Sequence, residues 1–271
     1  MSQTLLLAGC GKMGEAMLSG WLDRGISPSN INLVEPNDAT ATRLRETYAV
    51  STYATPGEIP KDEAPDFVVF AVKPQMMDVV APEYRRFASP STAFLSIAAG
   101  KTIAYFQKHL GTEAVIIRAM PNTPAAVRRG ITVAIANPHV SDAQRTSCDN
   151  LLQAVGSVEW VDDEGMIDAV TALSGGGPAY VFLLTECMAE AGKQAGLPDA
   201  LAERLARETV SGAGELMRQS DEPPAILRKN VTSPAGTTAE ALAILMADDA
   251  WQPLMTQAIA AAKKRSQELA G

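Results

Sequence analysis

The chain has 271 residues, with 31 acidic residues against 23 Lys and Arg, a formal charge of −8 and a pI near 4.9. A chain this long can bury a full core and is expected to form one large or two medium domains. The acidic balance and the lack of a basic run argue against nucleic acid or an anionic membrane as a partner. Two His and three Cys without metal-like spacing argue against a metal site, a disulfide framework and a histidine relay.

Targeting and membrane segments are not expected. The N-terminal apolar run, residues 5–8, has no positive region before it and is shorter than the core of a signal peptide. No stretch reaches the roughly 18 consecutive apolar residues of a membrane span. We therefore expect a cytoplasmic protein.

The first part of the chain alternates short apolar runs with amphipathic segments, which is typical of βαβ units. The first two units pair a strand at 5–8 with a helix at 13–21, and a strand at 31–34 with a helix at 38–48 that Asp38 caps. Further strands are expected at 67–70, 93–97, 115–117, 131–135 and 158–161. Uniformly apolar strands indicate helices on both faces of a sheet. The pattern predicts an α/β domain over residues 1–162, with a doubly wound, mostly parallel sheet.

The pattern becomes helical after about Asp162. Helices are predicted at 178–195, 200–218, 237–248 and 253–269, which gives an all-α domain over residues 163–271. The run 162–164 is expected to be a solvated boundary. The helix from Pro178 is apolar on nearly every side, more than one small helical layer can cover. We infer a homodimer or larger assembly; the central helix of a monomeric bundle is the alternative.

A glycine turn, residues 9–14, fits G-x-G-x-x-G between a predicted strand and helix, where it would hold a dinucleotide pyrophosphate as in Rossmann domains. Cys10 is expected only as a small residue in this turn. Glu35, at the end of the second strand, is placed to accept hydrogen bonds from a ribose with two free hydroxyls and to repel a 2′-phosphate. Glu35 thus favours NADH, but Arg43 and Arg45 follow on the next helix and can swing toward a 2′-phosphate. Both NAD and NADP stay open.

Three more turns follow predicted strands at the sheet edge where open α/β sheets bind ligands. They are residues 71–74, 96–100 and 120–124. Their small residues, Ala99 among them, leave space for a planar ring, and Asn122 can hold a carboxamide or a ribose. Each has an ordinary turn as its alternative.

Two segments of the second domain, 174–179 and 231–238, precede predicted helices and carry hydroxyl groups and small residues. Hydroxyls and exposed N–H groups at a helix N-terminus suit a small carboxylate. Ordinary helix capping is the alternative.

Five segments, residues 9–14, 71–74, 120–124, 172–180 and 231–238, resemble pyrroline-5-carboxylate reductases in order and spacing. The resemblance extends over about residues 4–265. It implies NAD(P)H-dependent reduction of 1-pyrroline-5-carboxylate to L-proline by hydride transfer to a cyclic imine, the last step of proline biosynthesis. It also implies a Rossmann domain and a helical domain that interlocks with its twin, often in a decamer of five dimers.

The resemblance assigns roles to individual residues. The cofactor-binding set comprises Gly9, Gly11, Lys12, Met13 and Gly14 at the pyrophosphate, Ala71, Val72, Lys73 and Pro74 on the nicotinamide side, and Glu35, Ala99 and Asn122. The substrate-binding set comprises Val231, Ser233, Gly236, Thr237, Thr238, Gly175 and Gly177. Thr238 is the candidate catalytic residue, because its hydroxyl aligns with the one placed near the ring nitrogen. The chain departs from many members at Ala235, where they carry Gly, at Gly176, where they carry another residue, and at Glu35, where NADP-preferring members tend to carry polar or basic residues.

The expected reaction requires the protein to position the substrate against the cofactor rather than to supply a strong general acid. The reason is that a cyclic imine is basic and can arrive protonated. Thr238 is expected to hydrogen-bond the imine nitrogen, directly or through a water, while Ser233 and the N–H groups of Gly236 and Thr237 anchor the carboxylate.

Two alternatives remain. A two-domain dehydrogenase acting on 3-hydroxy acids needs a Lys near an Asn, but Lys193 has no Asn within a helical turn, and Lys229 and Asn230 would face apart. The other is a sensor that binds a dinucleotide without turnover. The number of dimers, feedback by proline and the cofactor preference stay open.

Overall fold

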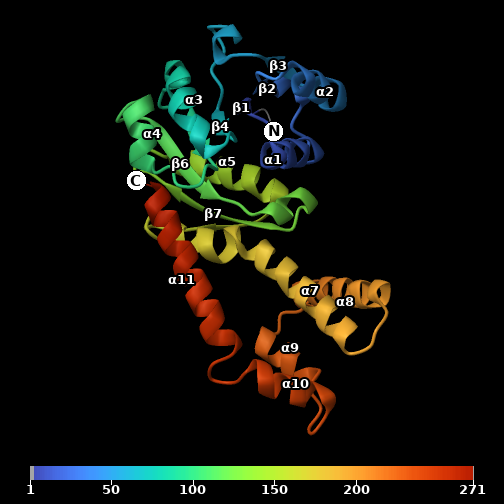
Figure 1. Cartoon of the computed structure of the whole chain (residues 1–271). Helices are drawn as coiled ribbons and strands as arrows, with labels where there is room; N and C mark the ends of the chain where they lie inside the picture. The colour runs from blue at the N-terminus through green and yellow to red at the C-terminus, as the bar shows by residue number, and fades with distance from the viewer. Residues whose placement is uncertain (1–2, 271) are drawn as a thin grey trace. The chain divides into compact units, whose positions relative to one another are not determined.

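The computed structural model describes residues 3–270, which form two compact units. Residues 3–175 and 263–270 make the first unit, and residues 176–262 make the second. The first contains an eight-stranded sheet and the second is helical (Figure 1).

The sheet has the strand order β3-β2-β1-β4-β5-β6-β7-β8. Its strands are β1 (Leu5–Ala8), β2 (Ile31–Val34), β3 (Ser51–Tyr53), β4 (Phe67–Phe70), β5 (Ala93–Ser96), β6 (Val115–Met120), β7 (Gly130–Ala136) and β8 (Gly156–Trp160). Only the β6–β7 pair is antiparallel among these strands, so the predicted, mostly parallel sheet is confirmed. The chain reverses its direction of travel across the sheet at β1, and such a switch point is where open α/β sheets bind ligands.

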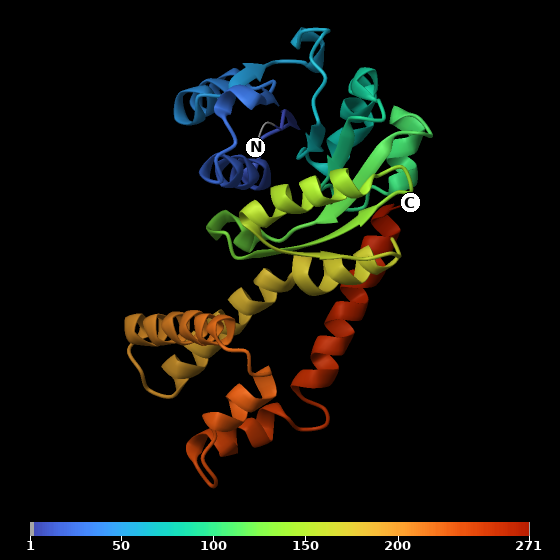
Figure 2. The same cartoon turned by 180° about the vertical axis from the view of Figure 1, so that it is seen from behind.

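Helices cover both faces of this sheet (Figure 2). They are α1 (Lys12–Asp23), α2 (Asp38–Tyr48), α3 (Met77–Glu83), α4 (Ile103–Leu110), α5 (Asp142–Leu152) and α6 (Met166–Val170). Successive residues of β1 enter opposite cores: Leu5 packs with Trp21 of α1, whereas Leu6 belongs to the cluster of Phe106 of α4. The doubly wound arrangement predicted from the apolar strands is thus confirmed.

Several local predictions need correction. Asn37, rather than Asp38, caps α2, because its Oδ1 accepts the N–H of Thr40 at 2.9 Å. Strand β3 is absent from the sequence prediction because it lacks an apolar run. Strand β6 extends to Met120, three residues beyond the predicted end, and the interruption by Arg118 explains the earlier stop.

The second unit consists of helices only. They are α7 (Gly177–Gln194), α8 (Asp199–Gln219), α9 (Pro224–Asn230), α10 (Thr237–Leu245) and α11 (Trp251–Ala270), whose last turns belong to the first unit. Helix α7 packs against α8. It nevertheless exposes much of its apolar surface in the single chain, including 63% of Phe182 and 58% of Leu183. The chain by itself therefore does not cover this helix.

The helical stretch 166–194 is long and apolar enough, by length and composition, to cross a membrane. This corrects the expectation of no such stretch. The prediction counted consecutive apolar residues, whereas a mean hydropathy tolerates isolated charges. Core helices of soluble proteins pass the same test, so the stretch alone does not indicate a membrane span.

Residues 163–175 pack with the sheet, and residues 263–270 contact them. Ile167 is buried against Val133 and Ile135 of β7, and Ser266 donates to Asp168 Oδ1 at 2.6 Å. The sequence places the domain boundary at 162/163, where strand-like runs end. The contacts change later, because α6 packs on the sheet and the end of α11 contacts α6.

Candidate active site

The three glycines of the 9–14 turn have distinct surroundings. Gly9 has a φ of +78°, and a Cβ there would lie 2.5 Å from Val72 Cγ1. A Cβ at Gly14 would lie 3.0 Å from the carbonyl oxygen of Gly9, whereas one at Gly11 would meet nothing within 4 Å. The fold therefore favours glycine strongly at Gly9, packs tightly around Gly14, and leaves open space beside Gly11 at the start of α1.

The first turn of α1 offers hydrogen-bond donors beside this space. Within residues 3–270, the N–H groups of Lys12, Met13 and Gly14 have no hydrogen-bond acceptor. Exposed N–H groups at a helix N-terminus attract phosphate. Burial raises the pKa of the Cys10 thiol to about 12, so the thiol stays protonated at neutral pH. This agrees with the prediction that Cys10 is only a small residue in the turn.

Glu35 lies at the carboxyl end of β2 and is tied to the glycine turn. Its Oε2 accepts the N–H of Cys10 at 3.4 Å, and its Oε1 accepts the N–H of Asn37 at 3.1 Å. No cation forms an ion pair with Glu35 in the described part of the chain. A carboxylate held by backbone donors at this edge is suited to accept hydrogen bonds from a ribose.

The two arginines of α2 already have partners. Arg43 donates through both terminal nitrogens to the carboxylate of Glu15, at 2.6 and 2.8 Å. Arg45 donates to the hydroxyl of Thr52 instead. The hydrogen bond from Arg43 lowers the pKa of Glu15. Neither arginine can turn toward a 2′-phosphate without breaking these contacts.

The predicted nicotinamide-side residues follow three parallel strands at one sheet edge. Ala71 follows β4 beside the glycine turn, where its N–H donates to Ala8 at 2.9 Å. Ala99 follows β5, in the turn that Gly100 completes with a φ of +72°. Asn122 follows β6, but its Oδ1 accepts the N–H of Ile131 at 3.0 Å. The backbone thus engages the side-chain oxygen of Asn122, which leaves the side-chain nitrogen to donate to a ligand.

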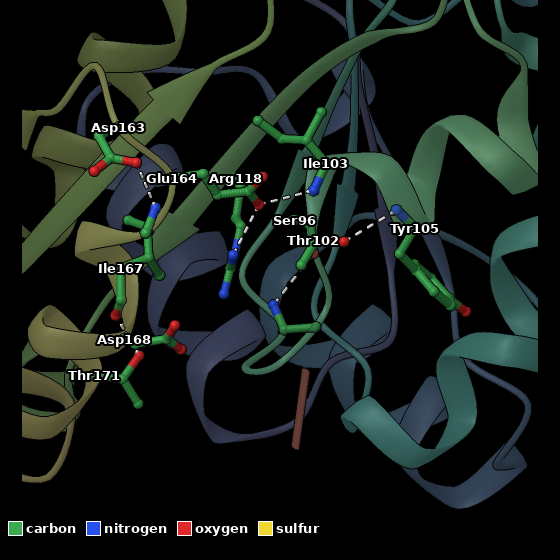
Figure 3. A network of polar contacts seen from close by, with 12 residues as sticks. Ser96, Thr102, Ile103, Tyr105, Arg118, Asp163, Glu164, Ile167, Asp168 and Thr171 are labelled. Carbon is green, nitrogen blue, oxygen red and sulfur yellow. Dashed lines mark hydrogen bonds and ion pairs between the residues drawn. The ribbon is translucent and has the colours of Figure 1, made fainter. Parts of the chain in front are cut away.

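An ion pair made by a buried arginine supports this edge, and the sequence analysis missed it (Figure 3). Arg118, on β6, is 3% exposed and donates to Glu164 Oε1 at 2.8 Å. The same oxygen accepts the N–H of Ile103 at the start of α4, at 2.9 Å. The sequence analysis expected Glu164 to belong to a solvated boundary. The structure corrects this, because Glu164 is paired with Arg118. An arginine inside an apolar strand was the available clue, because a buried charge needs a partner.

The segment 231–238 ends at the N-terminus of α10. Gly236 is the N-cap residue, and no side chain caps the helix. Its N–H, which was expected to anchor the substrate carboxylate, donates instead to the carbonyl of Ser233 at 3.1 Å. The N–H groups of Thr237 and Thr238 have no acceptor among residues 3–270. Ala235 has a φ of +57°, so the left-handed conformation is present although the chain has Ala where many members carry Gly. These donors suit a carboxylate.

The segment 174–179 differs from the prediction. It is not an isolated helix N-terminus, because a π-helical turn, Thr171–Gly175, leads from α6 into α7. A Cβ at Gly175 would lie 2.7 Å from Met120 Cε, whereas one at Gly177 would meet nothing within 4 Å. Gly175 thus has a packing role, and Gly177 leaves room for a ligand.

Comparisons with known proteins match both parts of the chain. Residues 164–269 match the family model described as pyrroline-5-carboxylate reductase dimerisation, and residues 4–100 match the one described as NADP oxidoreductase coenzyme F420-dependent. The pyrroline-5-carboxylate reductase of Pseudomonas aeruginosa is 39% identical over 262 residues, which cover 97% of this chain and 95% of that protein. The chain belongs to the pyrroline-5-carboxylate reductase family.

Solved structures extend the likeness to the whole fold. The pyrroline-5-carboxylate reductase of Coxiella burnetii is 33% identical, with a TM-score of 0.93 and complete coverage of both chains. The pyrroline carboxylate reductase of Plasmodium falciparum, solved with NADP bound, is 28% identical, with a TM-score of 0.83 over 99% of this chain and 98% of its own. Family membership favours the reductase over the 3-hydroxy-acid dehydrogenase. In agreement, Lys193 is engaged by Glu203 at 2.8 Å.

Proposed function

We propose that this chain reduces 1-pyrroline-5-carboxylate to L-proline with NAD(P)H. The observation that carries this proposal is the 39% identity to a pyrroline-5-carboxylate reductase over 97% of the chain. The glycine turn before α1 and the N-terminus of α10 support the proposal.

The residues at the sheet edge fit a dinucleotide. The open space at Gly11 would receive the pyrophosphate, and the N–H groups of Lys12, Met13 and Gly14 at the start of α1 would bind it. Glu35 would bind the adenosine ribose. The nicotinamide side would be held by Ala71, Val72, Lys73, Pro74, Ala99 and the amide nitrogen of Asn122. NAD(P)H, when bound, would supply the hydride.

The loop 231–238 supports a role in holding the substrate. The N–H groups of Thr237 and Thr238 would bind its carboxylate, with the hydroxyl of Ser233 and the backbone of Val231 and Gly236 beside it. Thr238 Oγ1 would hydrogen-bond the imine nitrogen, directly or through a water, and so favour the protonated imine. Gly177 would complete the substrate set by leaving space, whereas Met120 takes up the space beside Gly175.

We also propose that the chain pairs with a second copy through its helical region and acts in the cytoplasm. The dimerisation model covers residues 164–269, which include the exposed side chains of Val181, Phe182 and Leu183. A second copy, rather than lipid, would then cover α7. Light scattering should give a mass that is an even multiple of 28.6 kDa, up to the decamer of five dimers that the resemblance implies.

The activity is tested by following NADH and NADPH absorbance with 1-pyrroline-5-carboxylate, and NAD⁺ and NADP⁺ reduction with a panel of 3-hydroxy acids. We expect oxidation of the reduced cofactor and matching formation of L-proline, and no turnover of the hydroxy acids. Binding of the dinucleotide without oxidation would indicate a sensor and overturn the proposal.

A further inference from the structure

We propose that Glu15 sets the cofactor preference of this chain by holding Arg43 away from the 2′-phosphate of NADPH. The inference rests on the proposed dinucleotide site, but not on the reaction carried out there. It assigns Glu15 a part in specificity that the glycine motif does not imply.

The Glu15–Arg43 contact joins the two helices that flank the adenosine side. Glu15 lies in the first turn of α1, and Arg43 lies on α2. Both carboxylate oxygens accept from Arg43, and Tyr48 donates its hydroxyl to Glu15 Oε1 at 3.1 Å. A bidentate pair fixes the plane of the guanidinium as well as its position. Arg43 is thus held by a charged partner in a defined orientation.

The pair and Glu35 are both joined to the glycine turn. The backbone N–H of Cys10 donates to Glu35, and the N–H of Glu15 donates to the carbonyl of Gly11. Besides burial, the main cause, the charges of Glu15 and Glu35 raise the pKa of the Cys10 thiol and that of Arg43 lowers it, in keeping with three charges near one end of this turn. The side chain of Arg43 is 50% exposed, so it has room to turn once it is released.

The balance of charge at this end disfavours a 2′-phosphate. Such a group carries about −1.5 to −2 charges and needs an arginine or lysine. Arg43 is neutralised by Glu15, and Glu35 has no cation partner in the described part of the chain. Arg45 is the matched comparison, because it lies on the same helix but donates to the neutral hydroxyl of Thr52. Removal of the charge at residue 15 would leave Arg43 as a fork-shaped phosphate ligand.

The experiment measures the dissociation constants of NADH and NADPH by nicotinamide fluorescence, without 1-pyrroline-5-carboxylate. A partly exposed ion pair can be exchanged at small cost, so E15Q should raise the ratio of NADPH to NADH affinity by about fivefold. Arg43→Met in the E15Q background should abolish that gain. R43M alone and the control R45M should leave the ratio near that of the wild type.

Three results would overturn the inference. The ratio could stay unchanged in both E15Q and Glu15→Ala, although thermal melting shows that both variants fold. R43M alone could weaken NADPH binding, which would mean that Arg43 already reaches the phosphate. The gain in E15Q could persist without Arg43. If the wild type bound neither dinucleotide, the proposed function would fail as well, which separates the two cases.

Discussion

The guanidinium of Arg118 lies 2.8 Å from the carboxylate of Glu164, and the Arg118 side chain is only 4% exposed. This pair joins β6 to the residues before α6, and through Ile103 to the start of α4. Glu164 is 29% exposed, but its removal leaves the charge of the buried Arg118 uncompensated, which puts the cost near the lower end of the roughly 3–5 kcal/mol for breaking a buried pair.

We therefore expect Glu164→Ala to lower the free energy of unfolding by about 3 kcal/mol or more, measured in urea at fixed protein concentration. Asp163→Ala is the matched control, because Asp163 is exposed and only accepts the N–H of Gly165. It should cost about 1 kcal/mol or less. Equal losses of unfolding free energy in the two variants would mean that the Arg118–Glu164 pair does not contribute more to stability than an exposed hydrogen bond.

The glycine turn gives a second prediction, which separates folding from binding. Gly11→Ala should leave the melting temperature nearly unchanged, because the added Cβ meets no protein atom within 4 Å, yet it should strongly weaken NAD(P)H binding. Gly9→Ala should lower the free energy of unfolding by about 1–2 kcal/mol or more, because residue 9 has a positive φ and Val72 occupies the space. Unimpaired cofactor binding by G11A would contradict the proposed pyrophosphate site.

Glu35 gives a third prediction, on cofactor preference. Glu35→Ser should weaken NADH binding about tenfold, because hydrogen bonds between the ribose and a charged carboxylate are lost, and should weaken NADPH binding less. The KM values for both cofactors check this, with Glu46→Ser on the exposed face of α2 as the control. A strong preference of the wild type for NADPH would show that Glu35 does not select against the phosphate.

Thr238 gives a fourth prediction, on catalysis. Thr238→Ala should lower kcat/KM for 1-pyrroline-5-carboxylate about 10- to 100-fold, which corresponds to one hydrogen bond to a charged group. Thr238→Ser keeps a hydroxyl and should restore much of the rate. The affinity for NAD(P)H should stay nearly intact in both variants. Normal turnover by T238A would remove Thr238 from the mechanism.

Ala235 gives a fifth prediction, on stability. Its φ of +57° is strained for a residue with a Cβ, at a cost of about 1–2 kcal/mol, so Ala235→Gly should raise the free energy of unfolding by about 1 kcal/mol. Ala241→Gly, inside α10, should lower it by a similar amount. Urea unfolding of both variants checks the sign. Destabilisation by A235G would show that the loop holds this conformation without strain.

Patterns of neighbouring residues in the sequence account for much of the fold. The apolar runs of β1, β2 and β4 match their strands, because residues buried on both faces leave an uninterrupted pattern. Strand β3 and helix α9 lack such patterns, since Ser51 and Thr52 are polar and α9 is only seven residues long. Pairing with β2, rather than an apolar pattern of its own, makes β3 a strand.

The sequence by itself determined the glycine turn, the acid at Glu35 and the loop 231–238. Each of these depends on residues close together in the chain, where a type of residue at a fixed spacing fixes the backbone. The pairing of charges depends on residues far apart. The partner of Arg118 is 46 residues away and that of Arg43 is 28 residues away. Only the tertiary structure decided that Glu164 pairs with the buried Arg118 and that Arg43 is held by Glu15, because long-range packing sets which charges meet.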